Sequence, residues 1–283
     1  KRQGSLSYGD ERAAVAASAR ELGGLAATGY RLLVVHGNGP QVGRLMRAGF
    51  APVDLDIHVA QTQGELGYLI ASALEQASGE TTAALISRTQ VSARDPAFGR
   101  PDKPVGPVLS DRPSGSAVWL EHAAGWRRVV ASPRPRLVPE LPVIRELLAG
   151  AHVVAGGGGG VPVDARGRPC QAVVDKDRIA ALLGSALQAS ALVFATDVEG
   201  AFRDFDGPAP ALLSTLSPAQ ARGYLEQGIF GAGTMAPKVE SALDFALQTR
   251  RPAVIARLGA LGDGLAGRSG TRIAPDGAAD SSG

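Results

Sequence analysis

The sequence is poor in cysteine, and Cys170 is the one cysteine among its 283 residues. A single thiol excludes an internal disulfide framework and fits a protein of the reducing cytoplasm. No histidine stands beside Cys170 in the sequence, so we interpret it as an inert, half-buried thiol rather than a nucleophile.

Excess charge and long apolar runs are also missing. Lys and Arg total 29 against 27 for Asp and Glu, a net charge of +2, which argues against nucleic acid or a membrane surface as the main partner. No apolar run approaches the roughly 20 residues of a transmembrane helix. We expect a cytoplasmic protein whose basic residues act locally, at a site for a small molecule.

Short apolar strands alternate with helical patterns along most of the chain. Helices are expected at 11–28, 56–77, 143–149, 176–187, 217–227 and 235–248, and strands at 32–35, 81–86, 152–155, 191–195 and 253–256. The alternation predicts an α/β fold with a mostly parallel sheet and helices on both faces. Ligands bind outside the carboxyl ends of such strands, and three ends are glycine-rich or polar, at 36–40, 156–160 and 196–200.

Residues 92–142 interrupt this rhythm with prolines at 96, 101, 104, 107, 113, 133, 135, 139 and 142. Such a density forbids long helices and central strands. The segment is nevertheless too rich in Val, Trp and Phe for a disordered linker. We expect hairpins and loops that form a protruding lid subdomain outside the main sheet.

Two of the polar strand ends carry glycine clusters, Gly37-Asn38-Gly39 and Gly156 to Gly160. Glycines leave backbone N–H groups unobstructed by side chains, and such concavities bind phosphate oxygens. One cluster alone would suit an ordinary turn, but two, each after a buried strand, favour a phosphate site. Neither matches a Walker A loop or a dinucleotide-binding motif. His36 heads the first cluster, and we expect it to fix the loop as a donor rather than to transfer protons.

Two lysines lie where helices are expected to start. Lys176 stands between Asp175 and Asp177, and Lys238 follows Pro237 in a first helical turn. Asp175 alone could be a helix cap, and one of the lysines could be an ordinary surface charge. Together the lysines suit a clamp, because phosphoryl transfer requires neutralisation of both the transferring and the leaving oxygens.

A series of short motifs runs in order along nearly the whole chain. The motifs are HGNGPQVG from residue 36, TQV from 89, DPAF from 95, KPVGP from 103, SPRP from 132, GGGGGVPV from 156, VDKD from 174, TDV from 196, PKVE from 237 and GTRI from 270. In this order they resemble carbamate kinases of the amino acid kinase family, from about residue 8 to 274.

The resemblance implies a three-layer α/β/α sandwich that forms one amino acid kinase domain over residues 1–283, with the lid subdomain at 92–142 inserted in it. It implies phosphoryl transfer between ATP and carbamate, giving ADP and carbamoyl phosphate. Mg²⁺ would bridge the nucleotide phosphates, with no metal site built from protein side chains. Family members are homodimers, so the same is expected of this chain.

The resemblance also implies roles for individual residues. Lys176 and Lys238 would stabilise the transition state, and Asp175 would organise the lysines. The acceptor and the transferred phosphoryl group would contact Gly37, Asn38, Gly39, Gly157, Gly158, Gly159 and Arg134. The nucleotide would lie against Thr196, Asp197, Val198, Phe230 and Met235.

The chain departs from the family pattern at two places. The family begins with a strand that ends in a Gly-Gly-Asn loop against the phosphoryl group, and that segment would precede Lys1. We expect about 10–20 further residues in the native protein; a defective kinase is the alternative. Arg134 and Arg136 stand where the family often has lysine, which keeps a clamp for anionic groups and could shift the acceptor preference.

Two other functions stay open. The same fold could phosphorylate another small carboxylate or a phosphate monoester, although the motifs of the proline-rich segment favour carbamate. The chain could also be a non-catalytic, nucleotide-binding regulatory protein, for which the lack of the first strand is the argument.

Overall fold

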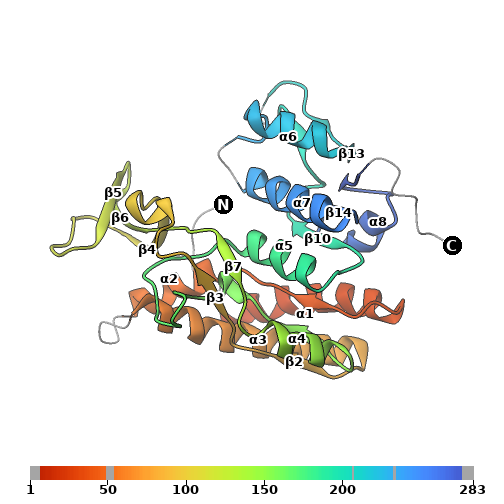
Figure 1. The fold of residues 1–283 in the computed structure, drawn as a ribbon, viewed down its shortest axis with the longest axis horizontal. Coiled ribbons are helices and arrows are strands. Elements are labelled where there is room, and N and C mark those ends of the chain that lie inside the picture. Colours follow the sequence, from red (N-terminus) through yellow and green to blue (C-terminus); the bar gives the residue numbers. More distant parts are fainter. Residues whose placement is uncertain (1–6, 49–53, 206, 232–233, 276–283) are drawn as a thin grey trace. The chain divides into compact units, whose positions relative to one another are not determined.

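The structure is a computed structural model that describes residues 7–48, 54–205, 207–231 and 234–275 (Figure 1). The chain forms two separate units, residues 1–179 and 180–283. The division falls inside helix α5 (Lys176–Ala186). No helix in the described part of the chain combines the length and the apolar character needed to cross a bilayer.

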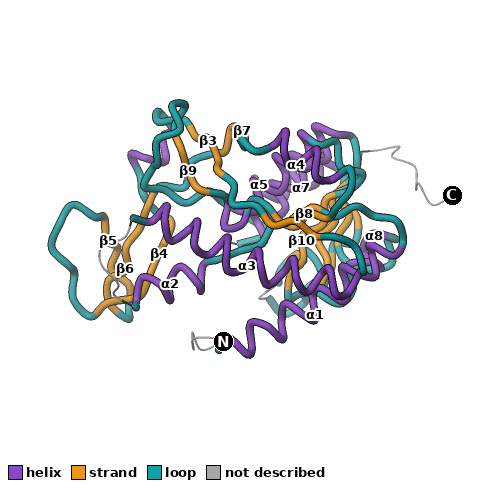
Figure 2. The backbone as a smooth tube through the Cα atoms, turned by 90° about the horizontal axis from the view of Figure 1, so that it is seen from below, coloured by secondary structure: helices purple, strands orange, loops and turns teal. Residues whose placement is uncertain are grey.

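The centre of the first unit is a parallel sheet with the strand order β1-β8-β2. Its strands are β1 (Leu33–Val34), β8 (His152–Val154) and β2 (Thr82–Ala84). All residues of β8 are buried, as expected for the middle strand of a parallel sheet. Helices α3 (Leu55–Ser78) and α4 (Leu141–Leu148) pack against β8, and α1 (Tyr8–Ala27) packs along α3 (Figure 2).

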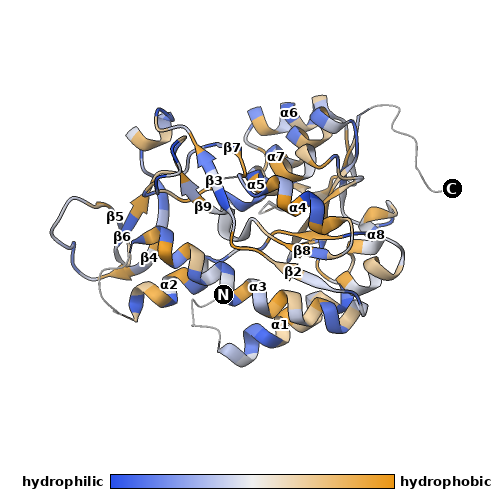
Figure 3. Ribbon diagram, turned by 60° about the horizontal axis from the view of Figure 1, so that its bottom comes forward, coloured by the Kyte–Doolittle hydropathy of each residue, from blue (hydrophilic) through white to orange (hydrophobic). Residues whose placement is uncertain are grey.

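Helix α3 is the main support of this sheet. Figure 3 shows hydrophobic residues along much of α3, whereas the start of α1 is more hydrophilic. Leu55, Val59, Leu66 and Leu74 of α3 are buried at near-helical spacing, which is the pattern that fastens one face of a helix to a core. Helix α1 approaches closely at Gly23, where a β-carbon would lie 2.8 Å from the carbonyl oxygen of Ala77.

Two further sheets of the first unit include strands from the proline-rich region. The first is a mixed sheet of β7 (Pro135–Leu137), β3 (Arg88–Val91) and β9 (Val161–Val163), in that order. The second is antiparallel and contains β4 (Lys103–Leu109), β6 (Gly125–Val130) and β5 (Val118–His122), in that order, after a short 3-10 helix at Pro96–Gly99.

The prolines in these strands lie in β4, β7 and β9, which are edge strands of their sheets. An edge strand tolerates proline because its outer N–H groups pair with no neighbouring strand. Of the excursion expected at 92–142, residues 103–130 form the separate antiparallel sheet, while β7 returns to the mixed sheet. The role of residues 92–142 as a lid stays a prediction.

The second unit is built on a four-stranded sheet with the order β10-β14-β15-β13. Its strands are β10 (Leu192–Thr196), β14 (Ala253–Arg257), β15 (Thr271–Ile273) and β13 (Thr215–Leu216). Strands β10 and β14 pair in parallel, as do β13 and β15, and the two pairs join through the antiparallel contact of β14 with β15. The unit also contains α6 (Pro218–Glu226), α7 (Met235–Thr249), α8 (Leu261–Leu265) and the hairpin of β11 (Phe202–Arg203) and β12 (Ala211–Leu212).

Helices α7 and α8 cover opposite faces of β14. Ala253 and Ile255 share a buried core with residues of α7, whereas a β-carbon on Gly264 of α8 would touch Val254 and Ala256. Alternate residues of a strand point to opposite faces. The second unit therefore has helix, sheet and helix layers, and the predicted α/β fold is confirmed.

Every helix and strand expected from the sequence is present, with ends shifted by a few residues. Helix α1 begins early because Ser7 and Asp10 form a capping box, in which each backbone N–H donates to the other side chain at 3.1 Å. Helix α2 (Gly39–Arg47) was not expected, because it starts inside the glycine-proline motif. Strands β3, β9 and β11 to β13 were also missed, since two to four residues are too few to show a period.

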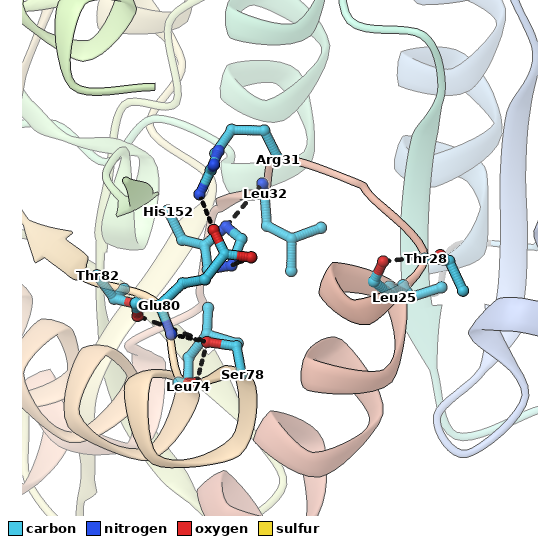
Figure 4. A network of polar contacts seen from close by, with 9 residues as sticks. All are labelled: Leu25, Thr28, Arg31, Leu32, Leu74, Ser78, Glu80, Thr82 and His152. Atoms are coloured by element: carbon cyan, nitrogen blue, oxygen red, sulfur yellow. Dashed lines mark hydrogen bonds and ion pairs between the residues drawn. The ribbon is translucent and has the colours of Figure 1, made fainter. Parts of the chain in front are cut away.

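His152 links the three strands of the parallel sheet at their amino ends (Figure 4). The side chain is fully buried, and its Nδ1 accepts a hydrogen bond from the Leu32 N–H at 3.3 Å. A backbone N–H can only donate, so the neutral ring carries its proton on Nε2, which lies 3.8 Å from Oε1 of Glu80. Glu80 also pairs with Arg31 at 2.5 Å. Burial is the largest effect on the pKa of His152 and lowers it. The negative charge of Glu80 opposes this, the positive charge of Arg31 adds to it, and the pKa stays below its usual value.

We predict that His152 makes the protein less stable in mild acid. Its folded pKa lies below the unfolded value of about 6.5, so unfolding takes up a proton and the free energy of unfolding falls as the pH drops through about 6.5. His152→Asn retains an acceptor for Leu32 and should flatten this dependence in urea unfolding measured from pH 7.5 to 5. His122→Asn, at the exposed end of β5, is the control and should keep the wild-type slope. Equal slopes for all three proteins would contradict the prediction.

Candidate active site

The loop after β1 leads directly into helix α2. Asn38 occupies the N-cap position, but its side chain makes no hydrogen bond to the helix, and Nδ2 donates instead to Thr62 Oγ1 on α3 at 2.9 Å. The N–H groups of Gly39 and Gln41 lie in the first turn, where a helix has no carbonyl acceptor for them. Gly39 is also exposed to solvent. The start of α2 is therefore an uncapped helix N-terminus, which is the kind that binds anions.

The glycine turn after β8, residues 156–160, packs directly against this loop. β-Carbons at Gly157 and Gly158 would collide with the His36 ring and the Asn38 amide. The Gly158 N–H donates to the carbonyl oxygen of His36 at 2.8 Å. Glycine is needed here for the close approach of the two loops, and at Gly158 also for a φ of +63°.

Most backbone N–H groups of the glycine turn are used inside the protein. Gly156 donates to Ser87 Oγ at 2.8 Å, and Gly159 and Gly160 donate to carbonyls of the turn itself at 3.0 Å. Within the described residues, Gly157 is the member of the turn whose N–H meets no protein acceptor. The turn thus differs from an open row of donors, and contact of Gly157, Gly158 and Gly159 with a phosphoryl group stays a prediction.

His36 fixes the loop in which it lies. Its Nδ1–H donates to the carbonyl oxygen of Gly37 at 3.0 Å. Burial lowers the pKa of the ring, and the hydrogen bond to Gly37 opposes that effect in part. His36 is therefore neutral at pH 7, and the geometry agrees with the expected role as a loop donor.

Lys176 is the first residue of α5, and its side chain lies across Gly37. A β-carbon on Gly37 would be 3.3 Å from Cδ and 3.4 Å from Cε of the lysine. Nζ is 2.6 Å from Oδ1 of Asp177, and the lysine side chain is 39% exposed. The structure thus brings Lys176 to the loop that precedes the uncapped start of α2.

Asp175 links the start of α5 to the antiparallel sheet. Its Oδ1 accepts a hydrogen bond from the Asp177 N–H at 2.9 Å, and its Oδ2 lies 3.1 Å from Nζ of Lys103 in β4. Burial raises the pKa of Asp175, but Lys103, the Asp177 N–H and Lys176 together hold that pKa below its usual value. Asp175 is therefore an anion at neutral pH that fixes Lys103 next to the start of α5.

The nucleotide-contact residues predicted from the resemblance all lie in the second unit. Thr196 ends β10, and its Oγ1 is 3.4 Å from Oδ1 of the exposed Asp197. Val198 follows and is half-buried. These residues stand at the carboxyl end of a parallel strand, where ligands of α/β sheets bind.

The remaining predicted residues of this unit are partly or wholly buried. Phe230 is in the hydrophobic core, and Met235, the first residue of α7, packs against it. Residues 232–233, between them, lie outside the described residues. Lys238 is 6% exposed in the first turn of α7. Nucleotide contact by Phe230 and Met235 stays a prediction, as does the catalytic role of Lys238.

The backbone of Arg134 is held by Asp95, which lies in the segment before the antiparallel sheet. Its backbone N–H donates to Oδ2 of Asp95 at 3.0 Å, and Oδ1 of Asp95 accepts from the Ala97 N–H at 2.9 Å. The side chains of Arg134 and Arg136 are exposed. Contact of Arg134 with an acceptor stays a prediction.

Sequence reasoning missed three polar residues that hold the site, namely Lys103, Ser87 and Thr62. Lys103 and Asp175 are distant in sequence, and nothing in either segment indicates the pair. Thr62 did leave a signal, because it lies three residues after Val59 and four before Leu66 and so falls on the buried face of α3. A polar residue at such a position requires a hydrogen-bond partner.

Comparison with known proteins places relatives along nearly the whole chain. The sequence profile described as the amino acid kinase family matches residues 4–257. A carbamate kinase of Escherichia coli K12 is 37% identical over 87% of this chain and 86% of its own length. A carbamate kinase of Pyrococcus furiosus is 36% identical over 95% and 93%. The solved structure of a carbamate kinase from Giardia lamblia bound to AMP-PNP has a TM-score of 0.89 and 30% identity, covering 98% of this chain and 95% of its own.

We predict that Gly157→Ala will disturb the site, because the added methyl group must displace the His36 ring. Overpacking of this kind costs about 1–3 kcal/mol of unfolding free energy. Gly24→Ala is the matched control, since nothing lies within 4 Å of a β-carbon at that helical position. It should stabilise the protein by about 0.5–1 kcal/mol. Urea unfolding of both variants tests this, and a Gly157→Ala protein as stable as wild type would disprove the close contact.

Proposed function

The chain belongs to the amino acid kinase family, and we propose that it transfers a phosphoryl group between ATP and carbamate, interconverting them with ADP and carbamoyl phosphate. The observation that carries the proposal is the arrangement of Lys176 over Gly37, beside an uncapped helix start. A cation and N–H groups that meet no acceptor within the described residues are what a transferred phosphoryl group requires.

The reaction is a direct in-line displacement. A carbamate oxygen bonds to the γ-phosphorus while the bond from that phosphorus to the β,γ-bridging oxygen breaks, and ADP leaves. The acceptor is already an anion, so no residue has to remove a proton from it. Positioning and charge neutralisation then supply the catalysis.

Three features of the first unit contribute to that neutralisation, namely the start of α2, Lys176, and the pair of Asp175 with Lys103. The N–H groups of Gly39 and Gln41 face anionic oxygens with the positive end of α2 behind them. Lys176 exchanges its partial pairing with Asp177 for a phosphoryl oxygen. Asp175 stays ionised and keeps Lys103 in place, so that a second ammonium group stands near the acceptor.

The nucleotide is assigned to the second unit, at Thr196, Asp197 and Val198 after β10, with Lys238 acting on the phosphoryl group. Among the described residues no three His, Cys, Asp or Glu side chains gather as a metal site. Mg²⁺ usually keeps several of its waters and binds through one or two carboxylates together with substrate phosphates, so we propose an ion that arrives with ATP. Bound there, Mg²⁺ would neutralise phosphate charge.

We further propose a cytoplasmic homodimer, paired through one face of α3 and the end of β2. A groove of about 560 Å³ lies there, lined in part by Tyr68, Ala71, Ala84 and Ile86. Tyr68 is 62% and Ile86 56% exposed. Large apolar side chains exposed around one groove mark an interaction surface.

The dimer is tested by Tyr68→Asp and Ile86→Asp, each of which places a charge in the groove. Both should sediment as monomers at concentrations where the wild type is a dimer, because an unpaired buried charge is strongly unfavourable. Ile57→Asp changes an isoleucine on the same helix that is exposed but not in the groove, and it should remain dimeric. Dimers of all three variants would exclude this face.

The activity is tested with ADP and carbamoyl phosphate, by coupling the ATP formed to a reporter reaction. Lys176→Met should lower kcat by about 10²–10³-fold, the range for loss of one charge-stabilising donor. ATP binding, measured by calorimetry, should be largely retained. Arg268→Met removes a cation from an exposed pair with Asp263 and should leave kcat unchanged.

Three other outcomes are informative. No ATP formation by the wild type would reject the carbamate kinase proposal. Turnover with another small carboxylate or a phosphate monoester, and none with carbamoyl phosphate, would show that this other compound is the acceptor. ATP binding without turnover on any acceptor would support a regulatory role.

A further inference from the structure

The two loops that approach each other at the candidate site are both fastened to helix α3, by adjacent residues. We propose that Thr62 and Gln63 are positioning residues for phosphoryl transfer, one for the loop after β1 and the other for the glycine turn. The proposal deepens the function given above and rests on it. Neither residue reaches the reacting atoms; each acts through the loop that it holds.

Thr62 controls the loop after β1 through Asn38. Thr62 is completely buried, and its hydroxyl oxygen accepts from Asn38 Nδ2 at 2.9 Å. The hydroxyl proton is directed back to the carbonyls of His58 and Val59, each at 2.9 Å. Thr62 therefore offers the Asn38 amide a fixed acceptor.

This contact also explains why α2 is uncapped. Asparagine at an N-cap normally turns its side chain toward the N–H groups of the first turn. Here the amide of Asn38 is held by Thr62 and makes no bond to the helix. The N–H groups of Gly39 and Gln41 are consequently left for an anion.

Gln63 controls the glycine turn through Ser87. Gln63 is 2% exposed and forms a two-point contact with the Ser87 backbone. Its Nε2 donates to the Ser87 carbonyl at 3.1 Å, and its Oε1 accepts from the Ser87 N–H at 2.9 Å. Ser87 Oγ then accepts from the Gly156 N–H at 2.8 Å, at the first residue of the turn. Gly156 has a φ of +72°, so this bond sets the direction in which the turn begins.

Adjacent residues of a helix point about 100° apart, so Thr62 and Gln63 reach different loops from one rigid element. The 24 residues of α3 are anchored along the core. Both loops are therefore attached to the same helix, which fixes the distance between them. A displacement of about 1 Å in a catalytic group can lower a rate by roughly 10²-fold, so the support has a direct kinetic consequence.

The test compares variants that remove the hydrogen bonds while keeping the shape. Thr62→Val and Gln63→Met should each lower kcat for ATP formation at least tenfold, with a smaller change in KM. Thr62→Ser retains the hydroxyl and should restore kcat to within about twofold of wild type. Gln76→Met is the control for Gln63→Met, since Gln76 lies exposed on the same helix and, within the described residues, its side chain bonds only to Ser72.

Amide hydrogen exchange supplies a readout that does not depend on activity. Thr62→Val should speed exchange selectively around Gly37 to Val42, and Gln63→Met around Gly156 to Gly160. This pattern would support the anchoring of the two loops even if the wild type made no ATP. Failure of the wild type to make ATP would reject the proposed activity and not the anchoring.

Two results would overturn the proposal. One is a kcat within twofold of wild type, per folded molecule, in both Thr62→Val and Gln63→Met. The other is a uniform rise in exchange over the first unit, which would mean that the two residues contribute only to general stability.

Discussion

The candidate site depends on one close contact, between the glycine turn after β8 and the loop after β1. No side chain separates them, since β-carbons at Gly157 and Gly158 would occupy the space of His36 and Asn38. The hydrogen bond from Gly158 to the His36 carbonyl fixes their register. With the loops this close, the aliphatic part of Lys176 can lie on Gly37 and its ammonium group can extend beyond the loop. A larger residue in the turn would separate the parts on which the chemistry depends.

The support for this contact is distributed over elements that are distant in sequence. Helix α3 holds both loops, and the antiparallel sheet holds Asp175 through Lys103. Helix α2 is fixed from another side, where Arg44 bridges Glu11 of α1 at 2.7 Å and Glu65 of α3 at 2.5 Å. Each of these contacts joins one helix, strand or loop to another. Losing any of them would therefore shift a loop of the candidate site although none of these side chains touches a reacting group.

The sequence was informative where the signal is local. Buried strands ending in glycine, lysines at helix starts and a proline-rich interruption are contiguous patterns. They predicted the α/β fold, a phosphate site at the glycine clusters and a role for Lys176, but not the contact of Lys176 with Gly37. The sequence was uninformative where function depends on long-range hydrogen bonds. Five successive glycines suggest open N–H donors, but Ser87 and the turn's own carbonyls accept from most of them. No pattern near residue 156 indicates that Ser87 will be there.

The charges at the start of α5 explain how a lysine can be both ordered and available. Asp175 is buried enough to be sensitive to charge, and Lys103 and Lys176 keep it ionised. The pair of Lys176 with Asp177 is different, because a lysine that is 39% exposed keeps much of its hydration. The carboxylate of the pair is much less open, since the Asp177 side chain is only 9% exposed, so a phosphoryl oxygen would have to approach the ammonium group from the exposed part of Lys176. In the proposed reaction, the Asp177 carboxylate would orient the ammonium group before substrate binds, and the exposed part of that group would then meet the phosphoryl oxygen.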